Sequence, residues 1–366
     1  MKAMHVVDAL NPGGAQKMFL ATLRAMHSSG RTGNVGYVIS GPAVLNDPLV
    51  RLMRLPSSPL MPFSALLALL HIPFLISAIM REKPDIVYAY HGTAAILSSA
   101  IASKISGAKM VARSFGAPRQ YRPLERLLWR IIPIFCDAVV VLSEDCRSRL
   151  VREGVPENKL RLIRNGKDAP AGASARARLG IGRGRLVVGM AGRITPGKNQ
   201  ASLIRMLPRL KSIRQDVTLI IAGAEEDAEY ARSLRSFVSA NGLDGNCRFL
   251  GFIDDMDGFF RACDIFAHPS AAEAGPGVVI EAMHAGLPVV SFHSGDAPAM
   301  LDKCGFLCAN EKEVESALVR LIKDEELRKS AGAKAKEKAL ECYGTGRMVA
   351  EYEDLFFSLA KQSPVP

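Results

Sequence analysis

The sequence is poor in aromatic residues, which make up 6% of the chain and include a single tryptophan. Proteins that bind nucleic acid through basic patches interleave those patches with aromatic side chains, so we expect no nucleic-acid partner. Paired cysteines are also missing, because the seven cysteines are odd in number and have no regular spacing. This predicts a reducing compartment rather than a disulfide framework.

Zinc-binding and secretory signals are lacking as well. Cys304 and Cys308 are the closest cysteines, but no second Cys or His pair near them would complete a zinc site. The residues after Met1 do not form a basic region followed by an apolar stretch and a cleavage site, as a secretory signal would. We therefore expect a cytoplasmic protein.

Length and charge indicate two domains of different character. The chain has 366 residues, of which 48% are hydrophobic and 23% charged, as in a soluble globular protein. Residues 1–168 contain 22 Lys and Arg against 11 Asp and Glu, whereas residues 169–366 contain 25 of each kind. Either the first domain meets an anionic partner, such as acidic lipid or a phosphorylated acceptor, or its surface is merely basic.

One apolar run, Leu60 to Met80, reaches the ~20 residues that a membrane span needs. It is interrupted by Pro62, His71 and Pro73 and continues directly into what reads as a turn and a buried strand. We expect a helix that is packed in the protein or grazes a membrane, rather than a span.

Short apolar strands alternate with helical patterns twice along the chain, which predicts two doubly wound α/β domains with a cleft between them. We expect an N-terminal domain over residues 1–168, a second domain over 169–345, and a C-terminal helical tail over 346–366 that packs back on the first domain. The low-complexity run 170–178 is the linker candidate. The expected strands are 4–8, 36–40, 85–90, 109–113, 138–142, 186–190, 217–222, 248–250, 264–267 and 288–290.

Two glutamates, Glu273 and Glu281, flank a Gly-Pro-Gly turn that opens an apolar helix. Free backbone N–H groups at a helix N-terminus suit a phosphate group, and acidic residues beside it could hold sugar or ribose hydroxyls. The constellation suits a nucleotide sugar, although a buried strand-turn-helix with two solvated glutamates would show the same spacing.

The loop Gly192-Arg193-Ile-Thr-Pro-Gly-Lys198 follows the first strand of the second domain and precedes a helix. Arg193 offers a planar fork of donors and Lys198 a compact charge, so together they could neutralise a diphosphate. The loop lacks the spacing of a Walker sequence. Alone, the two cations could equally be exposed on an ordinary turn.

Two weaker signals lie in the first domain. Gly13 and Gly14 follow the first strand and would let backbone approach a ligand, or simply form a tight turn. His91 directly follows the strand 85–90, at the edge of the sheet where ligands of open α/β sheets bind.

With these motifs in this order, the chain resembles the retaining GT-B glycosyltransferases of family four, the bacterial group 1 enzymes. The resemblance implies two Rossmann-like domains facing across a cleft, which bind the acceptor (N-terminal) and the nucleotide-sugar donor (C-terminal). It places Arg193 and Lys198 on the diphosphate, helped by backbone at Gly277, Val278, Gly13 and Gly14. It places Glu281 on the ribose, Phe252 by the base, Glu273 at the transferred sugar and His91 at the sugar or acceptor. No metal or other cofactor is implied.

Several positions depart from the family pattern. Lys167 stands where an aliphatic residue is usual, Ala274 replaces an aromatic residue, and Asp296 and Ala299 replace Gly and Glu. The acidic run Asp254-Asp255-Met-Asp257 superficially resembles a metal-binding motif of the other main glycosyltransferase fold, but its position favours a helix-capping loop.

The acceptor is indicated only indirectly. Residues 119–132 carry three arginines at helical spacing, namely Arg122, Arg126 and Arg130, beside Trp129 and other apolar residues. This is typical of a membrane-surface helix, or of a core-packed helix with a solvated basic edge. A lipid-linked, lipopolysaccharide or exopolysaccharide precursor is therefore the expected acceptor; a soluble transferase that makes a small glycoside, or a GT-B-like binding protein without catalysis, are the alternatives.

Overall fold

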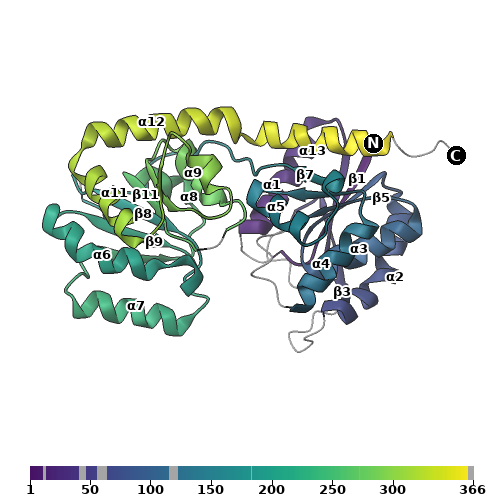
Figure 1. Cartoon of the computed structure of the whole chain (residues 1–366), viewed down its shortest axis with the longest axis horizontal. Coiled ribbons are helices and arrows are strands. Elements are labelled where there is room, and N and C mark those ends of the chain that lie inside the picture. Colours follow the sequence, from purple (N-terminus) through teal and green to yellow (C-terminus); the bar gives the residue numbers. More distant parts are fainter. Residues whose placement is uncertain are drawn as a thin grey trace. The chain divides into compact units, whose positions relative to one another are not determined.

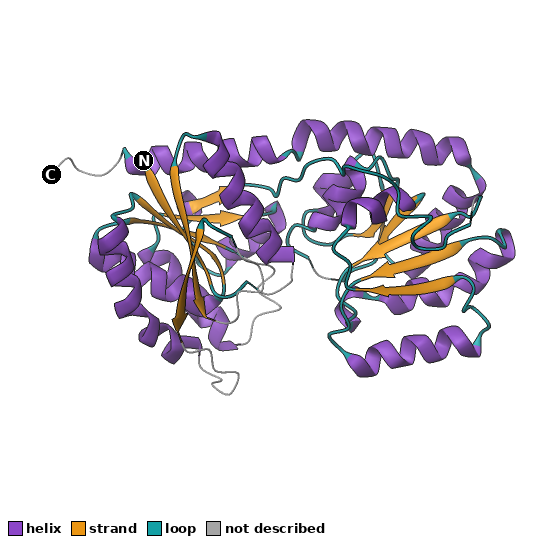
Figure 2. Cartoon of the chain, turned by 180° about the vertical axis from the view of Figure 1, so that it is seen from behind, coloured by secondary structure: helices purple, strands orange, loops and turns teal. Residues whose placement is uncertain are grey.

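The computed structural model describes residues 1–10, 14–40, 47–55, 64–114, 123–182, 184–271 and 273–361. They form two compact units, one of Met1–Asn165 with Thr345–Pro366 and one of Gly166–Gly344. Each unit contains one parallel sheet that is covered by helices on both faces (Figures 1 and 2). The prediction of an α/β protein built on two parallel sheets is confirmed.

The first unit has a seven-stranded sheet with the order β3-β2-β1-β4-β5-β6-β7. Its strands are β1 (Lys2–Val7), β2 (Gly33–Ser40), β3 (Val50–Leu55), β4 (Ile86–His91), β5 (Lys109–Arg113), β6 (Ala138–Val141) and β7 (Leu160–Leu162). Its helices are α1 (Gly14–Ser29), α2 (Ser64–Glu82), α3 (Thr93–Ser106), α4 (Pro123–Phe135), α5 (Glu144–Arg152), the 3-10 turn η2 (Glu157–Lys159) and the C-terminal α13 (Thr345–Ala360).

The two faces of this sheet form two apolar cores, because successive side chains of a strand point to opposite faces. Along β1, Met4 and Val6 belong to the core shared with α2, α3, α4 and α5. Ala3 and Val7 belong to the core shared with α1 and α13, in which Tyr352 and Phe356 are buried. The C-terminal helix therefore completes the first unit.

The second unit has a six-stranded sheet with the order β10-β9-β8-β11-β12-β13. Its strands are β8 (Val187–Ala191), β9 (Thr218–Ala222), β10 (Cys247–Gly251), β11 (Ile265–His268), β12 (Val289–Phe292) and β13 (Phe306–Cys308). Its helices are η3 (Pro196–Lys198), α6 (Gln200–Ile213), α7 (Ala228–Ala240), α8 (Met256–Ala262), α9 (Gly277–His284), α10 (Ala297–Leu301), α11 (Glu311–Lys323) and α12 (Glu325–Cys342).

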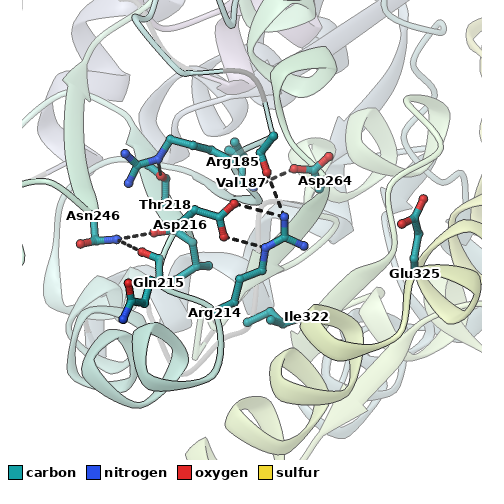
Figure 3. Close-up of polar contacts among 12 residues, drawn as sticks. Arg185, Val187, Arg214, Gln215, Asp216, Thr218, Asn246, Asp264, Ile322 and Glu325 are labelled. Atoms are coloured by element: carbon teal, nitrogen blue, oxygen red, sulfur yellow. Dashed lines mark hydrogen bonds and ion pairs between the residues drawn. The ribbon is translucent and has the colours of Figure 1, made fainter.

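Polar contacts hold the amino ends of these strands in place (Figure 3). The Asp264 carboxylate, just before β11, accepts the backbone N–H of Val187 at 2.7 Å. Asn246, just before β10, donates to the carbonyl oxygens of Gln215 and Val217 at 3.0 and 2.7 Å. These contacts lie at the amino ends of the strands, whereas the predicted functional residues lie in the loops after the carboxyl ends.

Two details of the predicted organisation are wrong. The run 170–178 is not a linker: the backbone N–H of Ala171 donates to Asp257, Arg176 pairs with Asp264, and Ala175 is buried. The chain passes from one unit to the other between Asn165 and Gly166 instead. Three strands were not expected, namely β3, which contains two arginines, and β7 and β13, which are only three residues long.

The apolar run 60–80 forms most of α2, as far as the structure describes it. Ala68, Leu75 and Ile79 lie in the core, whereas Leu69, Leu70 and Phe74 are exposed. No helix within the described ranges is long and apolar enough to cross a membrane. Residues 64–80 thus form a helix that packs against the core of the first unit, which agrees with one of the two expected alternatives.

Candidate functional site

The strand order of the second unit predicts where a ligand binds. The sheet continues from β8 to β9 and β10 on one side and from β11 to β12 and β13 on the other. Loops that leave two neighbouring strands in opposite directions open a crevice at their carboxyl ends, and open α/β sheets bind ligands there. In this unit the crevice lies after Ala191 and His268, the last residues of β8 and β11.

Lys198 and Glu273, one from each of these loops, are in ion-pair contact. The Glu273 carboxylate is also 3.3 Å from Nε2 of the buried His268. Burial by itself would raise the pKa of Glu273, but contact with His268 and with the Lys198 ammonium lowers this pKa to about 2. The site therefore contains a largely buried carboxylate that is ionised at neutral pH.

The backbone fixes the loop of Glu273 on two sides. The carbonyl oxygen of Gly197 accepts the N–H of Ala271 at 3.2 Å and the hydroxyl of Ser270 at 3.3 Å. On the other side, Gly295 has a φ of +56°, and a Cβ at this position would lie 2.3 Å from the Glu273 carbonyl oxygen. Only glycine fits both the backbone angle and the close approach.

Arg193 lies on the same loop as Lys198 but has a different partner. Its guanidinium donates to both oxygens of Glu226, at 2.6 and 2.7 Å. The backbone beneath it is tightly packed, because a Cβ at Gly223 would lie 1.9 Å from the Gly192 carbonyl oxygen. The predicted cation Arg193 is thus at the crevice, and its guanidinium pairs with Glu226, a residue that the sequence analysis did not identify.

Glu281 lies on α9, and its carboxylate oxygen is 2.8 Å from Nζ of Lys167. Gly277 and Val278 form the first turn of this helix, where backbone N–H groups point away from the helix and favour an anion. Pro276 precedes them, and its side chain cannot cap these groups. The turn after Glu273 therefore opens a helix as predicted, and the N-terminus of this helix lies beside the Lys167–Glu281 pair.

Phe252 is less closely connected to these groups. It follows β10, which is separated from β8 by β9, and its side chain is exposed. It therefore lies at the same edge of the sheet, about two strand spacings or ~10 Å from the crevice.

The acidic run 254–257 has the capping role predicted for it. The Asp255 side chain accepts the backbone N–H of Gly258 at 2.8 Å and caps α8, and Asp257 accepts the N–H of Ala171. Among the residues that the structure describes, no group of three or more His, Cys, Asp or Glu side chains is arranged to hold a metal ion.

In the first unit the corresponding crevice lies between β1 and β4. His91, the last residue of β4, has its Nδ1 3.2 Å from both carboxylate oxygens of Asp8, which follows β1. Burial would raise the pKa of Asp8, but the hydrogen bond and charge interaction with His91 together with backbone N–H donors outweigh it and lower this pKa. Gly14 is the first residue of α1, and Gly13 lies outside the described residues.

Helix α4 exposes apolar side chains on the surface of the first unit. Leu128, Trp129 and Ile132 are buried in the core, so the tryptophan is not a surface anchor. Leu127, Ile131 and Ile134 form an exposed row at helical spacing on another side, and Ile134 is 68% exposed. We call these three residues the α4 stripe. Arg122 lies outside the described residues, as does the side chain of Arg126.

Sequence reasoning gave no role at these sites to four residues, namely Asp8, Glu226, His268 and Lys167. Of these, it named only Lys167, as a departure from the family pattern. Asp8 and His268 stand at the carboxyl ends of strands, which was an available signal. Glu226 and Lys167 are far along the chain from their partners, and only the fold brings them together.

Two family models match the chain, one described as glycosyl transferases group 1 over residues 173–338 and one as glycosyltransferase family 4 over residues 12–169. A Corynebacterium glutamicum GDP-mannose-dependent monoacylated α-(1-6)-phosphatidylinositol monomannoside mannosyltransferase is 31% identical over 173 residues; the match covers 44% of this chain and 44% of that protein. An Escherichia coli UDP-Gal:α-D-GlcNAc-diphosphoundecaprenol α-1,3-galactosyltransferase is 24% identical over 307 residues, or 78% of each chain.

Among solved structures, Anabaena HepE in complex with UDP-glucose matches with a TM-score of 0.83 and 23% identity, over 98% of this chain and all of that one. A sucrose-phosphate synthase from Thermosynechococcus elongatus matches with a TM-score of 0.85 and 18% identity, over 99% of this chain. At these identities the likeness concerns the fold, which is that of the GT-B glycosyltransferases.

Proposed function

Because the chain belongs to the group 1, family-four-type glycosyltransferases, we propose that it transfers a sugar from a nucleotide diphosphate sugar to a hydroxyl group of a glycan acceptor. The observation that carries this proposal is the contact between Lys198 and the buried, ionised Glu273 at the crevice of the second unit. A fixed cation and a fixed carboxylate side by side suit a donor that has both a diphosphate and sugar hydroxyls.

The donor would bind to the second unit. Lys198 and Arg193 would hold the diphosphate, with backbone N–H groups at Gly277 and Val278 directed at the same charge. Glu281 would accept hydrogen bonds from the ribose, and Phe252 would contact the base.

The chemistry follows from where charge develops. As the sugar leaves the diphosphate, negative charge grows on the departing oxygen, and cations held in place before the reaction stabilise it. Glu273 would accept hydrogen bonds from the transferred sugar while Lys198 acts on the diphosphate. We propose that the sugar keeps its anomeric configuration, as the family resemblance implies.

A divalent metal would not be needed, because lysine and arginine side chains would balance the diphosphate. Activity should therefore persist after treatment with a chelator, with a metal-dependent transferase of the other fold as the control. Loss of activity that Mg²⁺ or Mn²⁺ restores would contradict this part of the proposal.

The acceptor would bind to the first unit, where Asp8 orients His91. A carboxylate on one ring nitrogen fixes the imidazole and makes the other nitrogen a better hydrogen-bond acceptor. His91 would thus contact the acceptor hydroxyl or the transferred sugar. The relatives described above are named for lipid-linked acceptors, and we propose a lipid-linked glycan precursor here as well.

The α4 stripe supports peripheral contact with an anionic membrane. Three neighbouring apolar side chains in water are unfavourable unless something covers them. Arg130 is exposed on the same helix and lies 3.5 Å from the Glu153 carboxylate, and the first 168 residues carry the whole excess of positive charge. A lipid surface of negative charge fits both features.

A panel of uridine, guanosine and adenosine diphosphate sugars tests the donor. Thermal stabilisation by one nucleotide class, lost in Arg193→Ala and retained in Lys329→Ala on α12, is the expected result. Transfer is then measured on a polyprenyl-diphosphate-linked sugar and on the free sugar, with the anomeric configuration of the product read by NMR. If none of the donors stabilises the protein, the proposed function is wrong.

A further inference from the structure

Lys167 lies where the chain enters the second unit, one residue after its boundary at Gly166. Its backbone N–H donates to the carbonyl oxygen of Tyr343 at 2.8 Å, next to Gly344, where the chain leaves this unit. The position of the Lys167 backbone is thus fixed by a hydrogen bond between the two crossings of the chain.

The side chain of Lys167 extends from this anchored position to α9. A Cβ at Gly277 would lie 3.5 Å from Cε of Lys167, so the aliphatic stem passes the first turn of the helix. The ammonium group ends 2.8 Å from the carboxylate of Glu281, one turn further along. The side chains of Lys167 and Glu281 are only 21% and 22% exposed, so the pair is more constrained than a solvated surface ion pair.

The helix itself is held rigidly beneath the pair. Val279, Ile280 and Met283 are buried in a core that includes Tyr343. Nε2 of His284, the last residue of α9, lies 3.4 Å from the same Tyr343 carbonyl oxygen that Lys167 contacts. Glu281 and Lys167 therefore have a common support, and neither partner depends on a flexible loop.

An ammonium next to a carboxylate matches the hydrogen-bonding capacity of a vicinal diol. Each hydroxyl donates one hydrogen bond and accepts others, a carboxylate only accepts, and a lysine ammonium has three N–H donors. One N–H of Lys167 is directed to Glu281, which leaves two for a ligand. A ribose can donate to Glu281 and accept from Lys167 at the same time.

We propose that Lys167 is a specificity-determining residue, which together with Glu281 recognises the ribose cis-diol of the donor nucleotide. This inference rests on the proposed function and deepens it. The aliphatic residue that is usual at position 167 in the family could support Glu281 only by packing. The pair would favour ribonucleotides over 2′-deoxyribonucleotides through hydrogen bonds in which both protein groups are charged.

The test measures binding of UDP, GDP and their 2′-deoxy forms by calorimetry for the wild type, Lys167→Met, Lys167→Arg and Lys329→Met. Methionine keeps an unbranched stem without the charge, and Lys329 forms a comparable pair with Glu325 at 2.9 Å on α12. We expect Lys167→Met to weaken binding of the preferred ribonucleotide roughly tenfold, the loss of a charged hydrogen bond. The 2′-deoxy form should be affected much less, Lys167→Arg should recover part of the loss, and Lys329→Met should bind as the wild type.

The possible failures are distinguishable. If the wild type binds neither UDP nor GDP, the proposed function itself fails. If the wild type binds and Lys167→Met binds equally well, or if it loses affinity for ribo and deoxy forms to the same extent, recognition of the diol by Lys167 is wrong. Thermal melting of each variant confirms that the fold is intact.

Discussion

The carboxylate of Glu273 is in ion-pair contact with the ammonium of Lys198, which is 75 residues earlier in the chain. Burial and pairing act in opposite directions on this carboxylate, and pairing dominates. The same contact that would bind a donor therefore also stabilises the second unit in the absence of ligand. Replacing Glu273 should therefore change both the free energy of unfolding and the activity.

The first prediction concerns the pH dependence of that stability. The pKa of Glu273 falls from 4.5 to about 2 on folding, so its contribution is complete above pH 4.5 and is lost as the pH falls towards 2. The shift corresponds to roughly 3 kcal/mol. The free energy of unfolding of the wild type should exceed that of Glu273→Gln at pH 6, and the difference should shrink between pH 4.5 and pH 2. Denaturant titrations at several pH values measure it, and a constant difference would contradict the assignment.

A second prediction concerns the partner of Arg193. Under the proposed function, Glu226 would compete with the donor diphosphate for the Arg193 guanidinium, so Glu226→Gln should strengthen nucleotide binding. The side chains of Arg193 and Glu226 are 62% and 51% exposed, and exposed pairs contribute at most about 1 kcal/mol, so we expect a gain of roughly twofold to fivefold. Calorimetry with UDP and GDP measures it. Glu325→Gln, which removes a partner of Lys329 on α12, is the control, and weaker binding by Glu226→Gln would show that Glu226 helps to hold the ligand.

Gly295 provides a third prediction. Its φ of +56° and the 2.3 Å approach of a Cβ to the Glu273 carbonyl oxygen make alanine unfavourable there. Gly295→Ala should lower the free energy of unfolding by about 1–3 kcal/mol and should reduce activity further, because the loop of Glu273 must move. Gly245→Ala is the matched control, since a Cβ there meets nothing within 4 Å. Equal stability and activity of the two variants would show that the loop tolerates the displacement.

The fourth prediction concerns the α4 stripe. Replacing Leu127, Ile131 and Ile134 together by serine should reduce binding to anionic phospholipid vesicles several-fold. The variant no longer buries the apolar area of these side chains in the lipid interface, so the free energy of this burial is lost. Their side chains are exposed, so the fold should be retained. Vesicle flotation measures the bound fraction, and Leu340→Ser, an exposed leucine on α12, serves as the control. Unchanged flotation of the triple variant would exclude the stripe as the membrane-contacting surface.

Local sequence was sufficient for most of the second sheet. The strands β8, β9 and β11 are five, five and four residues long and mostly apolar, and their expected positions agree with the observed ones within one residue. The run 170–178 was misjudged because small residues and alanine are compatible with a linker and with close packing alike. Only the contacts of Ala171, Ala175 and Arg176 distinguish the two.

The sequence by itself determined the α/β class, the two-sheet organisation and the positions of Lys198, Glu273 and Glu281 beside turns, since these follow from periodicity and local spacing. The tertiary structure decided which charge meets which. It pairs Lys198 with Glu273, Arg193 with Glu226, Lys167 with Glu281 and Asp8 with His91. Strand order sets these pairs. A crossover connection can place either of two strands next to a third. The free energy that selects one strand order is spread over the buried core and is not encoded in any short motif.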